Sequence, residues 1–118
     1  MPRDLRLYVD DMLEAIKQIR AYVKGYDQKR FASDRKTQDA VIRNLEVIGE
    51  AARNLPEEIK ALASGVEWRK ISGLRNILIH EYFGISVPIL WDIVQSRLKP
   101  LEEACLKILA SLDERAKR

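Results

Sequence analysis

Residues 37–55 read TQDAVIRNLEVIGEAARNL, and this stretch decides the fold. Its apolar positions recur at steps of three and four along the chain: Val41, Leu45, Ile48, Ala52 and Leu55. Such spacing places the apolar side chains on one face of an α-helix. Ser33 or Asp34 can supply the N-cap of this helix, and Pro56 sets its limit. The stretch therefore predicts a long amphipathic helix that buries one face.

The chain before this helix repeats the pattern. Its apolar residues are again three or four positions apart: Leu5, Tyr8, Met12, Ile16, Ile19 and Val23. Gly25 follows at the position where a helix C-cap would lie. The polar residues 26–32 leave room for one helical turn around Phe31. We therefore expect a first long helix that starts near Leu5 and ends before Gly25.

The chain after Pro56 also has a helical pattern. A brief helix is expected from Pro56 to about Ala63, because proline and acidic residues suit a first helical turn. Another helix is expected over about 67–82. The apolar stripe of the last helix begins after Ser86 and crosses Pro100 without losing phase. We interpret this last segment as one helix kinked at Pro100.

Length and composition agree with these helices. The 118 residues predict one compact domain over residues 1–118, and 5 Gly and 4 Pro are too few for the turns of an all-β fold. Long amphipathic helices with short connectors predict an all-α, antiparallel up-and-down bundle of four to five helices. The formal net charge of +3 permits an anionic partner such as nucleic acid, without requiring one.

Two features bear on location. The single cysteine, Cys105, excludes an intramolecular disulfide and fits a reducing cytoplasm. It also lies in phase with the apolar stripe of the last helix, so we expect a buried, unreactive thiol. No apolar run approaches the roughly 20 residues that span a bilayer, and the first residues, MPRDLR, do not resemble a signal peptide. A cytoplasmic protein that does not enter membranes is expected.

Reactive side chains are densest in residues 68–84, WRKISGLRNILIHEYFG. At about 100° per residue, Gly73, Asn76 and His80 fall within roughly 60° of one another on a helix. Asn76 and His80 are four residues apart, so the amide could orient the imidazole. Arg75 lies about 140° away from His80 and would have to reach around the helix or meet groups of a partner.

This inventory suits RNA cleavage by internal attack of a ribose 2′-OH. Arg75 offers a permanent forked charge for phosphate, and His80 can accept or donate a proton near neutral pH. Asn76 and Tyr82 can form hydrogen bonds to phosphate or ribose. Glu81 is the only acid nearby, which is not the carboxylate cluster of a metal-dependent nuclease. We therefore expect neither a metal nor another cofactor.

The single histidine limits what one chain can do. Chemistry that needs two imidazoles, as an acid and a base, requires two chains. A two-fold interface on the helix over 67–82 could bring Arg75 and His80 of both chains to one groove. Spacing alone also allows an interpretation in which Arg75 and His80 are surface or structural groups.

A second candidate lies within the helix over 37–55. Arg43, Glu46 and Glu50 are near-neighbours on one surface, where a solvated salt-bridge ladder is the simplest interpretation. Small residues flank Glu50, at Gly49, Ala51 and Ala52. Because such residues mark close helix packing, Glu50 is retained as a candidate carboxylate directed into a cleft.

Two stretches together resemble a known family. Residues 37–52 resemble the second-helix signature of the HepT-like proteins, small members of the HEPN superfamily of nucleotide-binding domains. Residues 68–84 resemble their other signature, in which Arg75, His80 and Tyr82 match the motif Arg-x4-His-x-Tyr. The resemblance spans nearly the whole chain, although residues 61–66 are less proline-rich than in many relatives.

The resemblance implies a helical homodimer that acts as a metal-independent endoribonuclease, the toxin of a type VII toxin–antitoxin pair. It implies that Arg75 and His80 are the catalytic pair, with Asn76 as a supporting polar group. The implied antitoxin is a minimal nucleotidyltransferase that adds AMP to Tyr82. Phosphate and adenine at Tyr82 would block RNA by charge and by volume.

Two alternatives to this function stay open. One is a non-catalytic HEPN module that binds nucleotide or pairs with a nucleotidyltransferase. The other is an interaction protein whose bundle merely dimerises and in which His80 is structural. Loss of RNA cleavage on replacing Arg75 or His80 distinguishes the enzyme from both.

Overall fold

All regular structure is helical in the computed structural model, which describes residues 4–80 and 87–117, with side chains for 4–74 and 87–117. The α-helices are α1 (Leu5–Val23), α2 (Gln28–Ala32), α3 (Arg35–Arg53), α4 (Glu57–Lys60), α5 (Trp68–His80), α6 (Val87–Ser96) and α7 (Leu98–Ala116). A 3-10 turn, η1 (Ala61–Ala63), follows α4. The predicted all-α class is confirmed.

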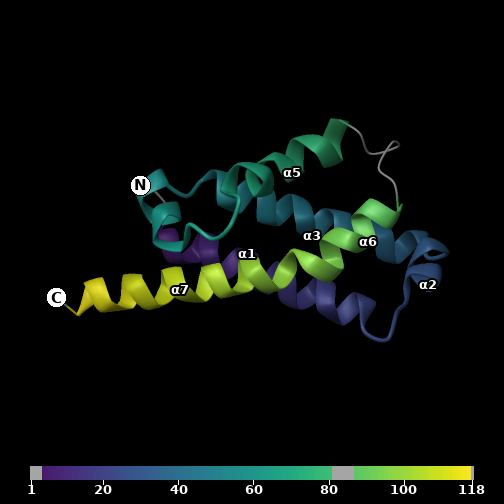
Figure 1. Ribbon diagram of the computed structural model, residues 1–118, viewed down its shortest axis with the longest axis horizontal. Coiled ribbons are helices and arrows are strands. Elements are labelled where there is room, and N and C mark those ends of the chain that lie inside the picture. Colours follow the sequence, from purple (N-terminus) through teal and green to yellow (C-terminus); the bar gives the residue numbers. More distant parts are fainter. Residues whose placement is uncertain (1–3, 81–86, 118) are drawn as a thin grey trace.

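The long helices alternate in direction and lie side by side (Figure 1). Helix α3 packs on both α1 and α5, while α7 packs on α1. The short α6 leads into α7 and rests against α2. The main packing contacts therefore run from α5 to α3, from α3 to α1 and from α1 to α7, and residues of α5 and α7 also line a common groove.

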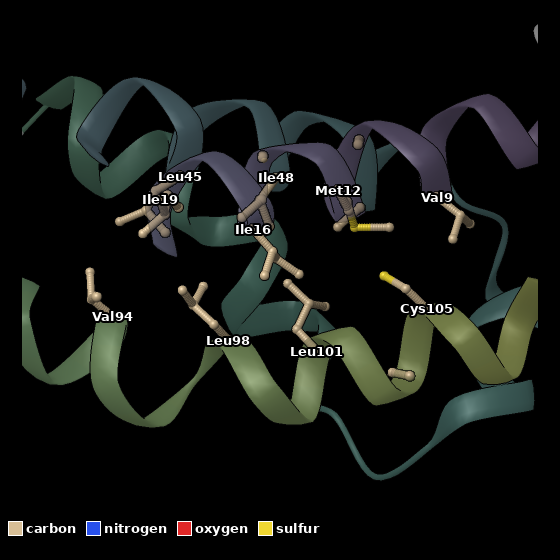
Figure 2. Close-up of a cluster of buried hydrophobic side chains, with 14 of the residues drawn as sticks. Val9, Met12, Ile16, Ile19, Leu45, Ile48, Val94, Leu98, Leu101 and Cys105 are labelled. Atoms are coloured by element: carbon tan, nitrogen blue, oxygen red, sulfur yellow. The ribbon is translucent and has the colours of Figure 1, made fainter. Parts of the chain in front are cut away.

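The core consists of the faces predicted from the apolar stripes. Met12, Ile16 and Ile19 of α1 and Leu45 and Ile48 of α3 are buried, as is the whole stripe from Leu90 to Ile108. Figure 2 shows Ile16 of α1 directed toward α7 and Met12 facing the thiol of Cys105. Burial of each large aliphatic side chain contributes about 1.5–3 kcal/mol to folding.

The helix ends follow from local chemistry. The side chain of Asp4 accepts a hydrogen bond from the Arg6 amide at 3.0 Å and so caps α1. Gly25 comes after the end of α1 with φ of +79°, a backbone conformation that L side chains rarely adopt. The predicted helical turn around Phe31 is confirmed as α2, in which Phe31 is completely buried.

Asp34, rather than Ser33, caps α3. Its Oδ1 accepts from the backbone amide of Thr37 at 3.0 Å. Its Oδ2 accepts from the hydroxyls of Thr37 and Tyr26, each at 2.7 Å. The hydrogen bond from Tyr26, followed by those from Thr37, lowers the pKa of Asp34 to about 2.

The prediction of one helix kinked at Pro100 is wrong. The chain forms two helices that are interrupted at Arg97, and Pro100 lies in the first turn of α7. The reason is that Pro100 has no N–H to donate to the carbonyl of Ser96, four residues earlier, and its ring crowds that carbonyl. The break therefore appears before the proline, and Pro100 occupies a first turn that tolerates it.

Two ion pairs join α1 to α7 along the outside of the bundle. Arg20 contacts Glu102 and Arg6 contacts Asp113, each at 2.7 Å. All four side chains are at least one-third exposed, so each pair contributes only about 0.2–1 kcal/mol. Buried apolar contacts, and not these pairs, hold α7 on α1.

Candidate functional site

Helix α5 carries most of the predicted site. Arg75, Asn76 and His80 all fall within its bounds, Trp68–His80. Since the backbone is helical throughout this range, the spacing on which the predicted grouping of Gly73, Asn76 and His80 depends is present. Tyr82, the predicted site of AMP addition, lies outside the described residues, as do the side chains of Arg75, Asn76 and His80.

The start of α5 is held by a buried hydrogen bond. The indole Nε1 of Trp68 donates to the carbonyl oxygen of Ala63 at 2.9 Å, across the turn that precedes the helix. The carbonyl of Glu67 accepts from the amides of Lys70 and Ile71 at 3.0 and 3.1 Å. Trp68 is 9% exposed, so this end of α5 is fixed to the 3-10 turn η1, which itself packs on α7.

A groove of about 700 Å³ runs beside the first half of α5. One wall is α5 with the preceding residues 65–67, and the other is the junction between α6 and α7. We call it the α5–α7 groove. Its apolar lining includes Ile71, Leu74 and Ile93, which are half-buried, and Leu101, which is buried.

The rim of the α5–α7 groove is cationic. Arg69, Lys70 and Arg97 line it and are exposed, whereas Glu67 is the acidic residue among the described residues of its lining. Lys70 Nζ lies 2.9 Å from Glu67 Oε2. The hydrogen bond and charge of Lys70, with a smaller effect of Arg97, hold the pKa of Glu67 below its usual value. Arg97 from one wall thus acts on Glu67 of the other.

A smaller hollow, of about 270 Å³, lies between α1 and α3. It is lined by acidic residues of α1, Asp11 and Glu14, and by Arg43 and Asn44 of α3. The buried Asn44 donates from Nδ2 to the carbonyl of Ala40 at 3.0 Å, an ordinary bond within the helix. Tyr22 and Val47 also line it, each about two-fifths exposed.

Glu50 is not directed into either hollow. It is exposed on α3 and lines neither the α5–α7 groove nor the hollow between α1 and α3. The small residues beside it are buried, at Gly49, Ala51 and Ala52. The close packing that these residues predicted is present, and the role of Glu50 stays a prediction.

Cys105 has the inert character expected of it. Its side chain is buried in the core, and burial, with a smaller effect of the Glu102 charge, raises its pKa to about 12. Among the residues that the structure describes, no group of three or more His, Cys, Asp or Glu could hold a metal ion. Within the same residues, no helix is both long and apolar enough to cross a membrane.

Sequence reasoning missed the part that α6 and α7 contribute to this region. Arg69 and Lys70 lie within residues 68–84, where reactive side chains are densest, whereas Arg97 lies outside this stretch. It lies more than twenty residues farther along the chain, inside what was interpreted as a continuous helix. Pro100 is the residue from which this could have been predicted, because a helix break before a proline exposes the residues between the two helices, here Arg97.

Comparison with known proteins agrees with the two motif stretches. A family model described as "Ribonuclease HepT-like" matches residues 12–108. No solved structure matches this chain.

Several curated proteins are similar over most of the chain. A "Probable ribonuclease HepT" of Thermococcus cleftensis is 40% identical over 86% of this chain and 93% of its own length. A protein of Methanocaldococcus jannaschii named "Putative RNase" is 44% identical over 87% of this chain and 89% of its own length. A second protein of that organism, named "Gamma-glutamylcyclotransferase and putative RNase", is 37% identical over 97% of this chain, which spans about half (51%) of that relative.

Proposed function

The chain belongs to the HepT-like ribonuclease family, and from this premise we propose that it is a metal-independent endoribonuclease that uses Arg75 and His80. The observation that carries the proposal is the continuous helix α5, which keeps Arg75, Asn76 and His80 in the spacing of the family motif. The cationic rim beside the first half of α5 supports a polyanionic substrate.

The proposed reaction is an internal transesterification at one phosphodiester of the RNA. The ribose 2′-oxygen attacks the adjacent phosphorus, its proton passes to His80, and the bond from phosphorus to the 5′-oxygen breaks. Arg75 stabilises the negative charge that develops on the phosphorane. The products are a 2′,3′-cyclic phosphate and a 5′-hydroxyl, and the departing oxygen needs a proton from an acid.

The need for both a base and an acid supports a homodimer. Each chain has one imidazole, so a second His80 must come from a second copy. Among the described residues helix α5 packs mainly on α3, which leaves part of its surface available to a partner. Sedimentation at working concentration tests this: a monomer that cleaves RNA with undiminished activity contradicts the shared site.

We propose that the chain is the toxin of a type VII pair in the cytoplasm, silenced by a minimal nucleotidyltransferase. In that reaction the hydroxyl oxygen of Tyr82 attacks the α-phosphorus of ATP and pyrophosphate leaves. Co-expression with the neighbouring nucleotidyltransferase should raise the intact mass of the chain by whole adenylyl units. Tyr82→Phe should keep the unmodified mass, and modification of that variant would exclude Tyr82.

The decisive test of the activity is RNA cleavage in EDTA by the wild type, Arg75→Ala and His80→Ala. Removing a general acid–base or a charge-stabilising group should lower the rate by about 10²–10⁴-fold. Lys107→Ala, at an exposed cation of α7, is the matched control and should cleave like the wild type. Unchanged cleavage by a folded His80→Ala variant contradicts the mechanism. RNA binding without cleavage would favour a non-catalytic HEPN module.

A further inference from the structure

The α5–α7 groove has a composition that suits one kind of ligand. Its floor is aliphatic, formed by Ile71, Leu74, Ile93 and Leu101. Its rim carries three cations against a single carboxylate. A ligand that matches both must present a flat or compact apolar group together with negative charge.

The cations come from both walls. Arg69 and Lys70 stand on α5, while Arg97 stands at the break between α6 and α7. Residues of both walls line the same pocket of about 700 Å³, so one ligand can meet both walls. Lys70 Nζ lies 2.9 Å from Glu67 Oε2. Among the described residues, neither Arg69 nor Arg97 forms such a close ion pair with Glu67.

The groove leads toward the motif of α5. Gly73 and Leu74 belong to its lining, and Arg75 is the next residue along the helix. A Cβ atom added at Gly73 would meet no atom within 4 Å, so the glycine borders open space. Gly73 shares its helix face with Asn76 and His80, so a strand bound in the groove would meet no steric obstacle at Gly73 on its way along this face.

We propose that the α5–α7 groove binds a nucleotide of single-stranded RNA that flanks the cleaved phosphate. The base lies on the aliphatic floor, and the phosphates of the strand lie at Arg69 and Arg97. The volume of about 700 Å³ is within the range of small-ligand sites. This inference rests on the proposed ribonuclease function.

The groove also predicts that the protein prefers unpaired to paired RNA. In an A-form duplex the bases are stacked and paired, so no base can reach the aliphatic floor. The protein should therefore favour single strands and loops. Phosphate contacts alone would not produce this preference, because both forms of RNA present phosphates.

The test uses a fluorescein-labelled, mixed-sequence 2′-O-methyl RNA 12-mer, which lacks the attacking hydroxyl and stays intact. Fluorescence anisotropy should show that Arg97→Glu and Gly73→Leu each weaken binding by roughly tenfold or more. Lys107→Glu, at an exposed cation of α7 outside the groove, is the control for net charge. Annealing the 12-mer to its complement should also weaken binding to the wild type by roughly tenfold.

Two further measurements distinguish a loss of groove binding from a general loss of positive charge and from misfolding of the variant. Arg97→Gln should make the dependence of log K on log salt less steep by about 0.7, the value for one phosphate contact on a single strand. Gly73→Leu should melt no lower than the wild type, because it replaces a helical glycine with a strong helix former and a Cβ atom at this position meets nothing within 4 Å. Reduced binding by this variant then reflects a filled groove.

The outcomes distinguish this inference from the proposed function. If the wild type binds and cleaves RNA while the groove variants behave like it, the groove inference is overturned and the ribonuclease stands. If Arg97→Glu and Gly73→Leu weaken self-association and leave RNA affinity unchanged, a second copy of the chain covers the groove and the inference is wrong. If the wild type neither binds nor cleaves RNA, both proposals fall.

Discussion

The indole of Trp68 and the backbone carbonyl of Ala63 are joined by a buried hydrogen bond of 2.9 Å. Trp68 is the first residue of α5, and Ala63 ends the 3-10 turn η1. Since η1 packs on α7, this bond connects the beginning of α5 to α7 through η1. It fixes one wall of the α5–α7 groove at the place where the helix starts.

Trp68→Phe should lower the free energy of unfolding by about 1 kcal/mol, because it keeps a large ring and leaves the Ala63 carbonyl without its donor. Urea unfolding followed by circular dichroism measures the change. Trp91→Phe is the matched control, since Trp91 is half-buried and contacts Phe31 through its ring, with centroids 5.1 Å apart. Equal loss in the two variants would show that the bond to Ala63 contributes nothing specific.

The cap at Asp34 should make stability depend on pH in the acid range. The folded pKa of about 2 lies below the ordinary value of 3.8, so the carboxylate stabilises the folded state above the ordinary value. This contribution is lost as the pH falls from 3.8 toward 2. Asp34→Asn should therefore melt several degrees lower at neutral pH and lose less stability than the wild type across that window.

Thermal unfolding of Asp34→Asn and wild type from pH 5 to pH 2 measures the difference. Tyr26→Phe removes the largest cause of the shift and should give an intermediate pH dependence. Parallel curves for all three proteins would contradict the role of the Tyr26 and Thr37 hydrogen bonds.

The thiol of Cys105 should resist modification in the folded protein. Burial raises its pKa to about 12, so almost no thiolate exists at pH 8 and no reagent reaches it. Mass spectrometry after iodoacetamide treatment should find the native chain unmodified and the urea-unfolded chain labelled once. Rapid labelling of the native chain would place the thiol at the surface. Cys105→Ser should cost about 1–3 kcal/mol, because it places a polar hydroxyl in a buried apolar layer.

Much of the fold follows from hydrophobic periodicity. The stripe from Val41 to Leu55 is buried as predicted, because long amphipathic segments have one way to remove their apolar faces from water. The break at Arg97 was missed because Pro100 left the apolar phase intact. Periodicity reports which side chains are buried, whereas a missing backbone N–H decides where the hydrogen-bond ladder stops.

The candidate site was predictable in part. Arg75, Asn76 and His80 lie on one helix, as the periodicity predicts, and their role as a site stays a prediction. The α5–α7 groove was not predictable, because Glu67 and Arg97 come to line one pocket through the packing of distant helices. Glu50 is exposed and lines neither hollow. Its small neighbours reported close packing correctly, but they did not determine on which side of α3 the carboxylate lies.

Replacement by alanine should change the stability of the protein in opposite directions at Gly25 and at Gly73. A Cβ atom would meet nothing within 4 Å at either position, so sterics between residues do not distinguish them. Gly73→Ala should stabilise the protein by up to about 1 kcal/mol, since it lies within a right-handed helix. Gly25→Ala should destabilise it by roughly 1–2 kcal/mol, since φ is +79° there. Thermal unfolding of both variants checks the two signs.

The conformation at Gly25 also makes this position a test of handedness. A D-alanine, introduced by chemical ligation, prefers positive φ and has open space for its methyl group. It should stabilise the turn after α1 by about 0.4–1 kcal/mol, because it narrows the conformations of the unfolded chain without straining the folded one. At this one residue the protein demands the mirror image of the amino acids that the ribosome supplies, and glycine is the genetically encoded residue that can adopt that geometry without strain.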